Sequence, residues 1–127
     1  MIVDASALVA SLGNPKSERL LFGEGLAAPD LLIPETLNAF WKLQRAGRSI
    51  PALSILLSTL DHVRIVPSRP HAARAAELAD RLDHPVYDCL YLALAEAEGD
   101  VLLTADAAFE RKTRVPGLRK RVRLMPA

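Results

Sequence analysis

Residues 86–98 are the part of this chain that most restricts how it can fold. They predict a helix that carries apolar side chains on nearly every face. These side chains are Val86, Cys89 and Leu90–Ala95. A helix of this kind is stable only when neighbouring elements cover it on all sides. The segment therefore predicts a central helix buried inside one hydrophobic core.

Short apolar segments alternate with helical segments along the rest of the chain. Strands are expected at 1–3, 63–66, 101–104 and 122–124, and helices at 5–8, 16–22, 30–46, 49–60, 72–82 and directly after 106. Asp30 is the expected N-cap of the long helix. Alternating strands and helices imply an α/β fold whose parallel sheet has helices on both faces. A chain of 127 residues fits one domain, so a single domain over residues 1–127 is expected.

Composition narrows the class of protein but not its activity. Half of the residues are hydrophobic and only 5% are aromatic, so the core must be mainly aliphatic. No apolar run reaches the length of a membrane span, about 18 residues, and no signal-peptide pattern opens the chain. The single cysteine, Cys89, cannot form an internal disulfide. We therefore expect a cytoplasmic protein that does not enter a membrane.

Positive charge gathers near the C-terminal end, although the net charge of the chain is only +1. The basic residues there are Arg111, Lys112, Arg114, Arg119, Lys120, Arg121 and Arg123, and Glu110 is the only acid close to them. Such a run can be a solvated surface that favours solubility. It can equally be a patch that binds the phosphates of a nucleic acid.

Four acidic residues stand where a solvated surface does not explain them: Asp4, Glu35, Asp88 and Asp106. Asp4 and Asp106 directly follow predicted strands, and ligands of open parallel sheets gather beyond the carboxyl ends of the strands. Asp88 lies in the first turn of the buried helix, where an unpaired carboxylate is costly. Each has a structural alternative, since Asp106 can cap a helix, Asp4 can accept backbone N–H bonds and Glu35 can lie on the surface.

Taken together, the four acids predict a metal site. Few lysines or arginines lie beside them in the sequence. Two carboxylates about 5 Å apart repel by about 3 kcal/mol at an effective dielectric constant near 20, so four need a compensating cation. Oxygen ligands without histidine or cysteine favour Mg²⁺ or Mn²⁺ over zinc. A site of this kind polarises a phosphate group and activates water.

Four sequence blocks also resemble those of a known family, the PIN-domain nucleases. The blocks are residues 2–7 (IVDASA), 28–35 with Asn38, 87–95 (YDCLYLALA) and 103–106 with Phe109. They occur in the order of the family and cover essentially the whole chain. The short single-domain form is similar to the VapC-type toxins of bacterial and archaeal toxin–antitoxin pairs.

The resemblance implies a PIN-like three-layer α/β/α domain around a parallel sheet. It also implies Mg²⁺- or Mn²⁺-dependent cleavage of single-stranded or loop RNA, often tRNA or rRNA, a homodimer, and a small antitoxin that blocks the site. By position, Asp4, Glu35, Asp88 and Asp106 match the four family acids. Asp4 and Asp88 are the expected direct ligands. Asp106 is a ligand or holds a metal-bound water, and Glu35 is a ligand or the general base.

The same resemblance assigns three supporting residues. Ser6 and Thr104 match hydroxyl neighbours that orient acids or waters, and Asn38 is a candidate for the same role beside Glu35. Cys89 departs from the family, where alanine is usual, and as a small, readily buried residue it implies no change of function.

Several other residues receive weaker assignments. Phe40, Trp41, Leu56 and Leu57 are either ordinary core or a surface for a dimer or antitoxin. The histidines receive no role, and Tyr87 and Tyr91 are expected to pack.

Two other functions compete with a nuclease. A receiver-like or haloacid-dehalogenase-like domain also binds Mg²⁺ beside an aspartate at the end of its first strand. The former needs a late-strand lysine that 101–104 does not provide, and the latter needs Asp-x-Asp-x-Thr, whereas Asp4 is followed by Ala-Ser-Ala. The second competing function is that of a PIN-like protein without catalysis, which only pairs with an antitoxin or binds RNA. The presence of all four acids argues against it.

Overall fold

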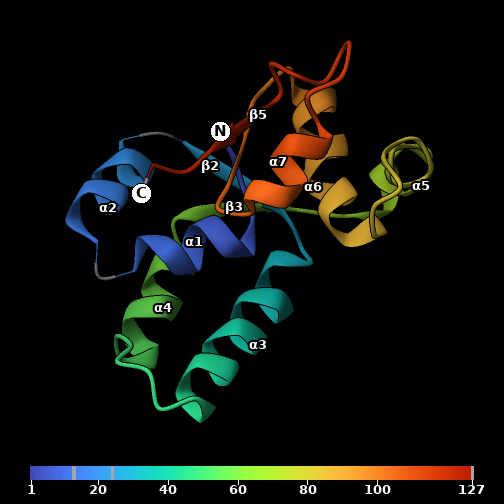
Figure 1. Cartoon of the computed structure of the whole chain (residues 1–127). Helices are drawn as coiled ribbons and strands as arrows, with labels where there is room; N and C mark the ends of the chain where they lie inside the picture. The colour runs from blue at the N-terminus through green and yellow to red at the C-terminus, as the bar shows by residue number, and fades with distance from the viewer. Residues whose placement is uncertain (13, 24, 127) are drawn as a thin grey trace.

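The computed structural model describes residues 1–12, 14–23 and 25–126, and its strands form one parallel sheet (Figure 1). The strands are β1 (Ile2–Val3), β2 (Leu26–Pro29), β3 (Val63–Val66), β4 (Leu102–Thr104) and β5 (Val122–Leu124), in the order β3-β2-β1-β4-β5. β1 is central, because Ile2 lies opposite Ala27 on one side and Leu102 on the other. The expected α/β class with a parallel sheet is confirmed.

Helices cover both faces of this sheet. They are α1 (Ala5–Ser11), α2 (Pro15–Phe22), α3 (Leu32–Arg45), α4 (Leu53–Leu60), the short 3-10 helix η1 (Arg69–His71), α5 (Ala72–Leu82), α6 (Val86–Glu98) and α7 (Ala107–Lys112). Right-handed connections between parallel strands place α1–α4 on one face and α5–α7 on the other, as Figure 1 shows. In the described part of the chain, no helix has both the length and the apolar character needed to cross a bilayer.

The core is built around α6, as its sequence predicts. Cys89 and the run from Tyr91 to Ala95 are buried, and α6 packs against α5 and the central strands. The first turn of α6 is not buried as the sequence predicts, because Val86 is 40% and Tyr87 58% exposed. This turn lies at the carboxyl edge of the sheet, beyond the elements that cover the middle of the helix.

The segment before α3 corrects the expected order of elements. Leu26–Pro29 forms the buried strand β2, which was not predicted, and α3 begins only at Leu32. Asp30 is not its N-cap, because the Asp30 carboxylate accepts a hydrogen bond from the Ser68 hydroxyl. Its sequence, Leu-Ala-Ala-Pro, lacks the β-branched residues that mark a strand, and pairing with both β1 and β3 stabilises it. Similarly, α4 begins at Leu53 and not at residue 49.

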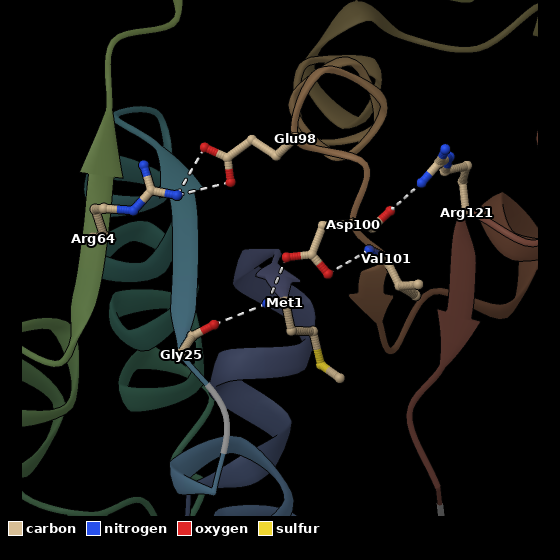
Figure 2. A network of polar contacts seen from close by, with 7 residues as sticks. All are labelled: Met1, Gly25, Arg64, Glu98, Asp100, Val101 and Arg121. Carbon is tan, nitrogen blue, oxygen red and sulfur yellow. Dashed lines mark hydrogen bonds and ion pairs between the residues drawn. The ribbon is translucent and has the colours of Figure 1, made fainter.

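Polar contacts join the amino ends of the strands, as Figure 2 shows. The amino group of Met1 donates to the carbonyl of Gly25 at 2.8 Å and pairs with the Asp100 carboxylate at 2.8 Å. Arg121 donates to the carbonyl of Asp100 at 3.1 Å. These contacts tie β1 to the residues that precede β2, β4 and β5, so they hold together the edge of the sheet opposite the strand carboxyl ends.

Thr36 offers a test of how the core is packed. Its hydroxyl is the one buried side-chain oxygen or nitrogen without a hydrogen-bond partner among the described residues. Replacing Thr36 by valine keeps the shape and removes a desolvated hydroxyl, so Thr36→Val should raise the free energy of unfolding by about 1 kcal/mol. Urea unfolding of the purified protein measures this change.

Thr59 provides the matched control, because it is also buried but its hydroxyl donates to the carbonyl of Ile55 at 2.8 Å. Thr59→Val should therefore give no gain in stability. A Thr36→Val protein less stable than the wild type would contradict the prediction.

Candidate active site

Four carboxylates meet at the carboxyl edge of the sheet, around a cavity of about 120 Å³. The lining residues are Asp4, Ala5, Ser6, Glu35, Asp88 and Asp106. Segments far apart in the sequence therefore bring together all four acids singled out from it. Their metal-binding and catalytic roles stay predictions.

Each of the four acids lies at the N-cap or in the first turn of a helix. Asp4 is the N-cap of α1 and accepts from the backbone N–H of Ala7 at 2.9 Å. Asp106 is the N-cap of α7 and accepts from Phe109 at 3.0 Å. Glu35 and Asp88 lie in the first turns of α3 and α6. Because the N-terminus of a helix carries partial positive charge, each helix favours the anion at its own start.

Asp4 is the most buried of the four, with 4% exposure. Burial raises its pKa to about 6, the Asp88 charge adds to the rise, and hydrogen bonds from Thr104, Ser6 and Ala7 oppose it. The Ser6 hydroxyl donates to Asp4 Oδ1 at 2.7 Å. An Asp4 carboxylate that is ionised at neutral pH thus lacks full compensation from the protein.

The other three acids each have one oxygen held by a protein donor. Tyr91 Oη donates to Glu35 Oε1 at 2.6 Å, and His84 Nε2 lies 2.6 Å from Asp88 Oδ2. Phe109 donates to Oδ1 of Asp106. The second oxygen of each group has no hydrogen-bond partner among the described residues. Each carboxylate can therefore offer one oxygen to a ligand in the cavity while the other fixes its position.

The hydroxyl groups of Ser6 and Thr104 connect the turns that carry Asp4 and Asp106. They lie 3.2 Å apart, and Ser6 Oγ accepts from the backbone N–H of Ala105 at 3.0 Å. Thr104 Oγ1 accepts from the N–H of Asp106 at 3.1 Å. Asn38 is exposed on α3 and does not line the cavity, so its supporting role remains only a prediction.

Two residues at this site were not assigned a role from the sequence. His84 is largely buried, contacts Asp88 and packs on Phe109 with ring centroids 4.6 Å apart. Tyr91 was expected only to pack, yet its hydroxyl binds Glu35. For Tyr91 the spacing was an available signal, because it lies three residues after Asp88 on α6 and residues three apart share a helix face. His84 precedes α6, so the helix period gave no such signal for it.

The C-terminal basic run does not line the cavity. Arg114 pairs with Glu110 at 2.8 Å, and the side chain of Lys112 donates to the carbonyl of Asp83 at 2.6 Å. Arg121 lies at the opposite edge of the sheet, where it contacts Asp100 (Figure 2). These basic side chains therefore do not neutralise the four acids.

The donor chemistry of the cavity fits a hard divalent cation. Its charged lining groups are carboxylates, and no lysine or arginine belongs to the lining. Oxygen donors of this kind suit Mg²⁺ or Mn²⁺. Among the described residues, no three acidic, histidine or cysteine side chains converge tightly enough to hold one ion. The carboxylates thus surround the cavity without closing on a single point, and binding requires side-chain adjustment.

Comparisons with known proteins agree with this architecture. The family model of the PIN domain matches residues 1–115. The crystal structure of PAE2754 from Pyrobaculum aerophilum superposes with a TM-score of 0.76 and 29% identity, covering 98% of this chain and 87% of that one. A toxin–antitoxin complex from Klebsiella pneumoniae gives a TM-score of 0.60 and 15% identity over 83% of this chain and 85% of that chain, a likeness of fold alone. Among curated proteins, none matches the chain significantly.

The raised pKa of Asp4 predicts how stability depends on pH. The folded protein binds the Asp4 proton more tightly than the unfolded chain, so ionisation of Asp4 should cost stability as the pH rises from about 4 through about 6. In the metal-free protein, Asp4→Asn should therefore raise the free energy of unfolding by about 1–3 kcal/mol above pH 7.

The same substitution should have little effect below about pH 3, where Asp4 is protonated in both the folded and the unfolded state. Urea unfolding in EDTA across this range measures the difference between variant and wild type. A difference that did not change with pH would show that the charge of Asp4 is not its cause.

Proposed function

Because the chain belongs to the PIN-domain family, we propose that it is a Mg²⁺- or Mn²⁺-dependent endoribonuclease that hydrolyses phosphodiesters in single-stranded or loop RNA. PIN domains are typically nucleases. The observation that carries the proposal is the meeting of four carboxylates from four helix N-termini around one cavity. Without a cation, this cavity repels an anionic phosphodiester.

A bound divalent ion would neutralise this charge, polarise the phosphate and lower the pKa of water. Asp4, Asp88 and Asp106 are the residues that we assign to holding it. Ser6 and Thr104 orient the turns that carry Asp4 and Asp106. Glu35 either joins the ligands or accepts a proton from the attacking water, whose oxygen forms the new bond to phosphorus as one P–O ester bond breaks.

We further propose that this nuclease is the cytoplasmic toxin of a toxin–antitoxin pair, and that it forms a homodimer and binds a small antitoxin protein. The likeness of fold to a toxin–antitoxin complex supports this proposal. So does an apolar stripe on successive turns of α3, where Ile33, Leu37 and Trp41 are exposed. Exposed apolar patches are typical of protein-binding surfaces.

The four residues of α3 and α4 that the sequence left as either core or an interaction surface divide between the two. Trp41 and Leu57 are exposed, but Phe40 and Leu56 are buried and belong to the core. We also propose that the PIN domain extends over residues 1–127, beyond the matched 1–115, because β5 pairs with β4 and completes the sheet.

Alanine substitution of the acids tests the proposed activity. Asp4→Ala and Asp88→Ala should each reduce cleavage of an unstructured RNA to background in Mn²⁺ or Mg²⁺, and EDTA should abolish cleavage by the wild type. Asp80→Ala removes an exposed carboxylate on α5 and serves as the matched control with full activity. Full activity in Asp4→Ala or Asp88→Ala would refute the site, and a metal-binding protein that cuts no RNA would indicate a non-catalytic relative.

The toxin role predicts an effect on growing cells. Induction of the wild-type chain in a bacterial host should arrest growth, because cleavage of tRNA or rRNA stops translation. Induction of Asp4→Ala at the same protein level should leave the growth rate unchanged. Equal growth with both proteins would count against the toxin role.

A further inference from the structure

Tyr91 makes a contact that the packing of the core does not require. It lies on α6, it is fully buried, and its hydroxyl donates to Glu35 Oε1 on α3 at 2.6 Å. The two residues are 56 positions apart in the sequence. A phenylalanine would fill the same space, so the hydroxyl contributes a polar contact and not volume.

The direction of this hydrogen bond follows from the chemistry of its two groups. A carboxylate has no hydrogen to donate, so the Tyr91 hydroxyl is the donor and Glu35 Oε1 the acceptor. The contact therefore satisfies one carboxylate oxygen of Glu35 and leaves the other for a further ligand.

The contact also restricts where the Glu35 side chain can point. Glutamate is the longest acid at the site, and in the half-buried first turn of α3 it has several staggered conformations open to it. With Oε1 bound to Tyr91, the carboxylate stays at the cavity that it lines. Oε2 has no hydrogen-bond partner within the described part of the chain.

We propose that Tyr91 is a positioning residue of the metal site, whose hydroxyl holds Glu35 so that its second carboxylate oxygen is presented to a divalent ion. The inference rests on the proposed function, because it takes Glu35 as a ligand of that ion. It concerns the assembly of the site and not the chemical step. Residues that orient metal ligands typically change metal affinity by about 10–100-fold when they are substituted.

Mn²⁺ binding by the purified full chain, without RNA, tests the proposal. Electron paramagnetic resonance titration would compare the wild type with Tyr91→Phe, Glu35→Gln and the double variant. Tyr91→Phe should weaken Mn²⁺ binding by about tenfold. The double variant should bind no more weakly than Glu35→Gln, because a residue that acts only through Glu35 has no further effect once that carboxylate is gone.

Tyr87→Phe is the matched control, since Tyr87 lies one turn earlier on the same helix and is 58% exposed. Its Mn²⁺ affinity should equal that of the wild type. Urea unfolding of each variant separates loss of fold from loss of binding. Should Tyr91→Phe not fold, Glu35→Asp takes its place, because it keeps the charge while withdrawing the carboxylate from Tyr91, and it should lose Mn²⁺ affinity likewise.

The proposal is overturned if Tyr91→Phe binds Mn²⁺ as tightly as the wild type. It is also overturned if adding Tyr91→Phe to Glu35→Gln weakens Mn²⁺ binding by the same factor as Tyr91→Phe alone does. These outcomes leave the proposed function intact if the wild type binds Mn²⁺ and cleaves RNA. Conversely, the expected affinities in a protein that cuts no RNA support the role of Tyr91 and refute the nuclease. A wild type that binds no Mn²⁺ refutes both.

Discussion

The convergence of four carboxylates at one small cavity is the constraint on which the arrangement of this site depends. Asp4, Glu35, Asp88 and Asp106 line the same space, and among the described residues no lysine or arginine belongs to this lining. Hydrogen bonds and helix N-termini compensate part of the charge, but burial, with a smaller contribution from the Asp88 charge, still raises the pKa values of Asp4 and Glu35. The negative charge that the protein leaves uncompensated suits the cavity to a divalent cation.

For Asp4 and Asp106, the contacts that begin the helices are also the contacts that hold the acids. Asp4 and Asp106 satisfy backbone N–H groups at the starts of α1 and α7, so each carboxylate is fixed by the fold before any ligand binds. Their structural and functional interpretations are therefore not alternatives. Glu35 and Asp88 do not cap their helices, and side chains from elsewhere, Tyr91 and His84, hold one oxygen of each instead.

The two edges of the sheet differ in how their charges are arranged. At the amino edge, opposite charges are paired, as in the contact between Met1 and Asp100, and the pairs join neighbouring strands. At the carboxyl edge, like charges gather. The amino edge therefore joins neighbouring strands, while the carboxyl edge gathers the acids.

Local sequence pattern was sufficient for elements whose signal lies within a few residues. The bounds of α5 and α6 and the N-cap at Asp106 follow from apolar periodicity, proline, and the preference of aspartate for helix starts. The positions of Asp4, Asp88 and Asp106 at strand and helix ends follow in the same way. Only the tertiary structure decided that Leu26–Pro29 is a strand, because its stability comes from pairing with β1 and β3. It alone also decided that the hydroxyl of Tyr91 on α6 meets Glu35 on α3. Side-chain contacts of this kind depend on how helices pack around a shared core, and no local propensity encodes that packing.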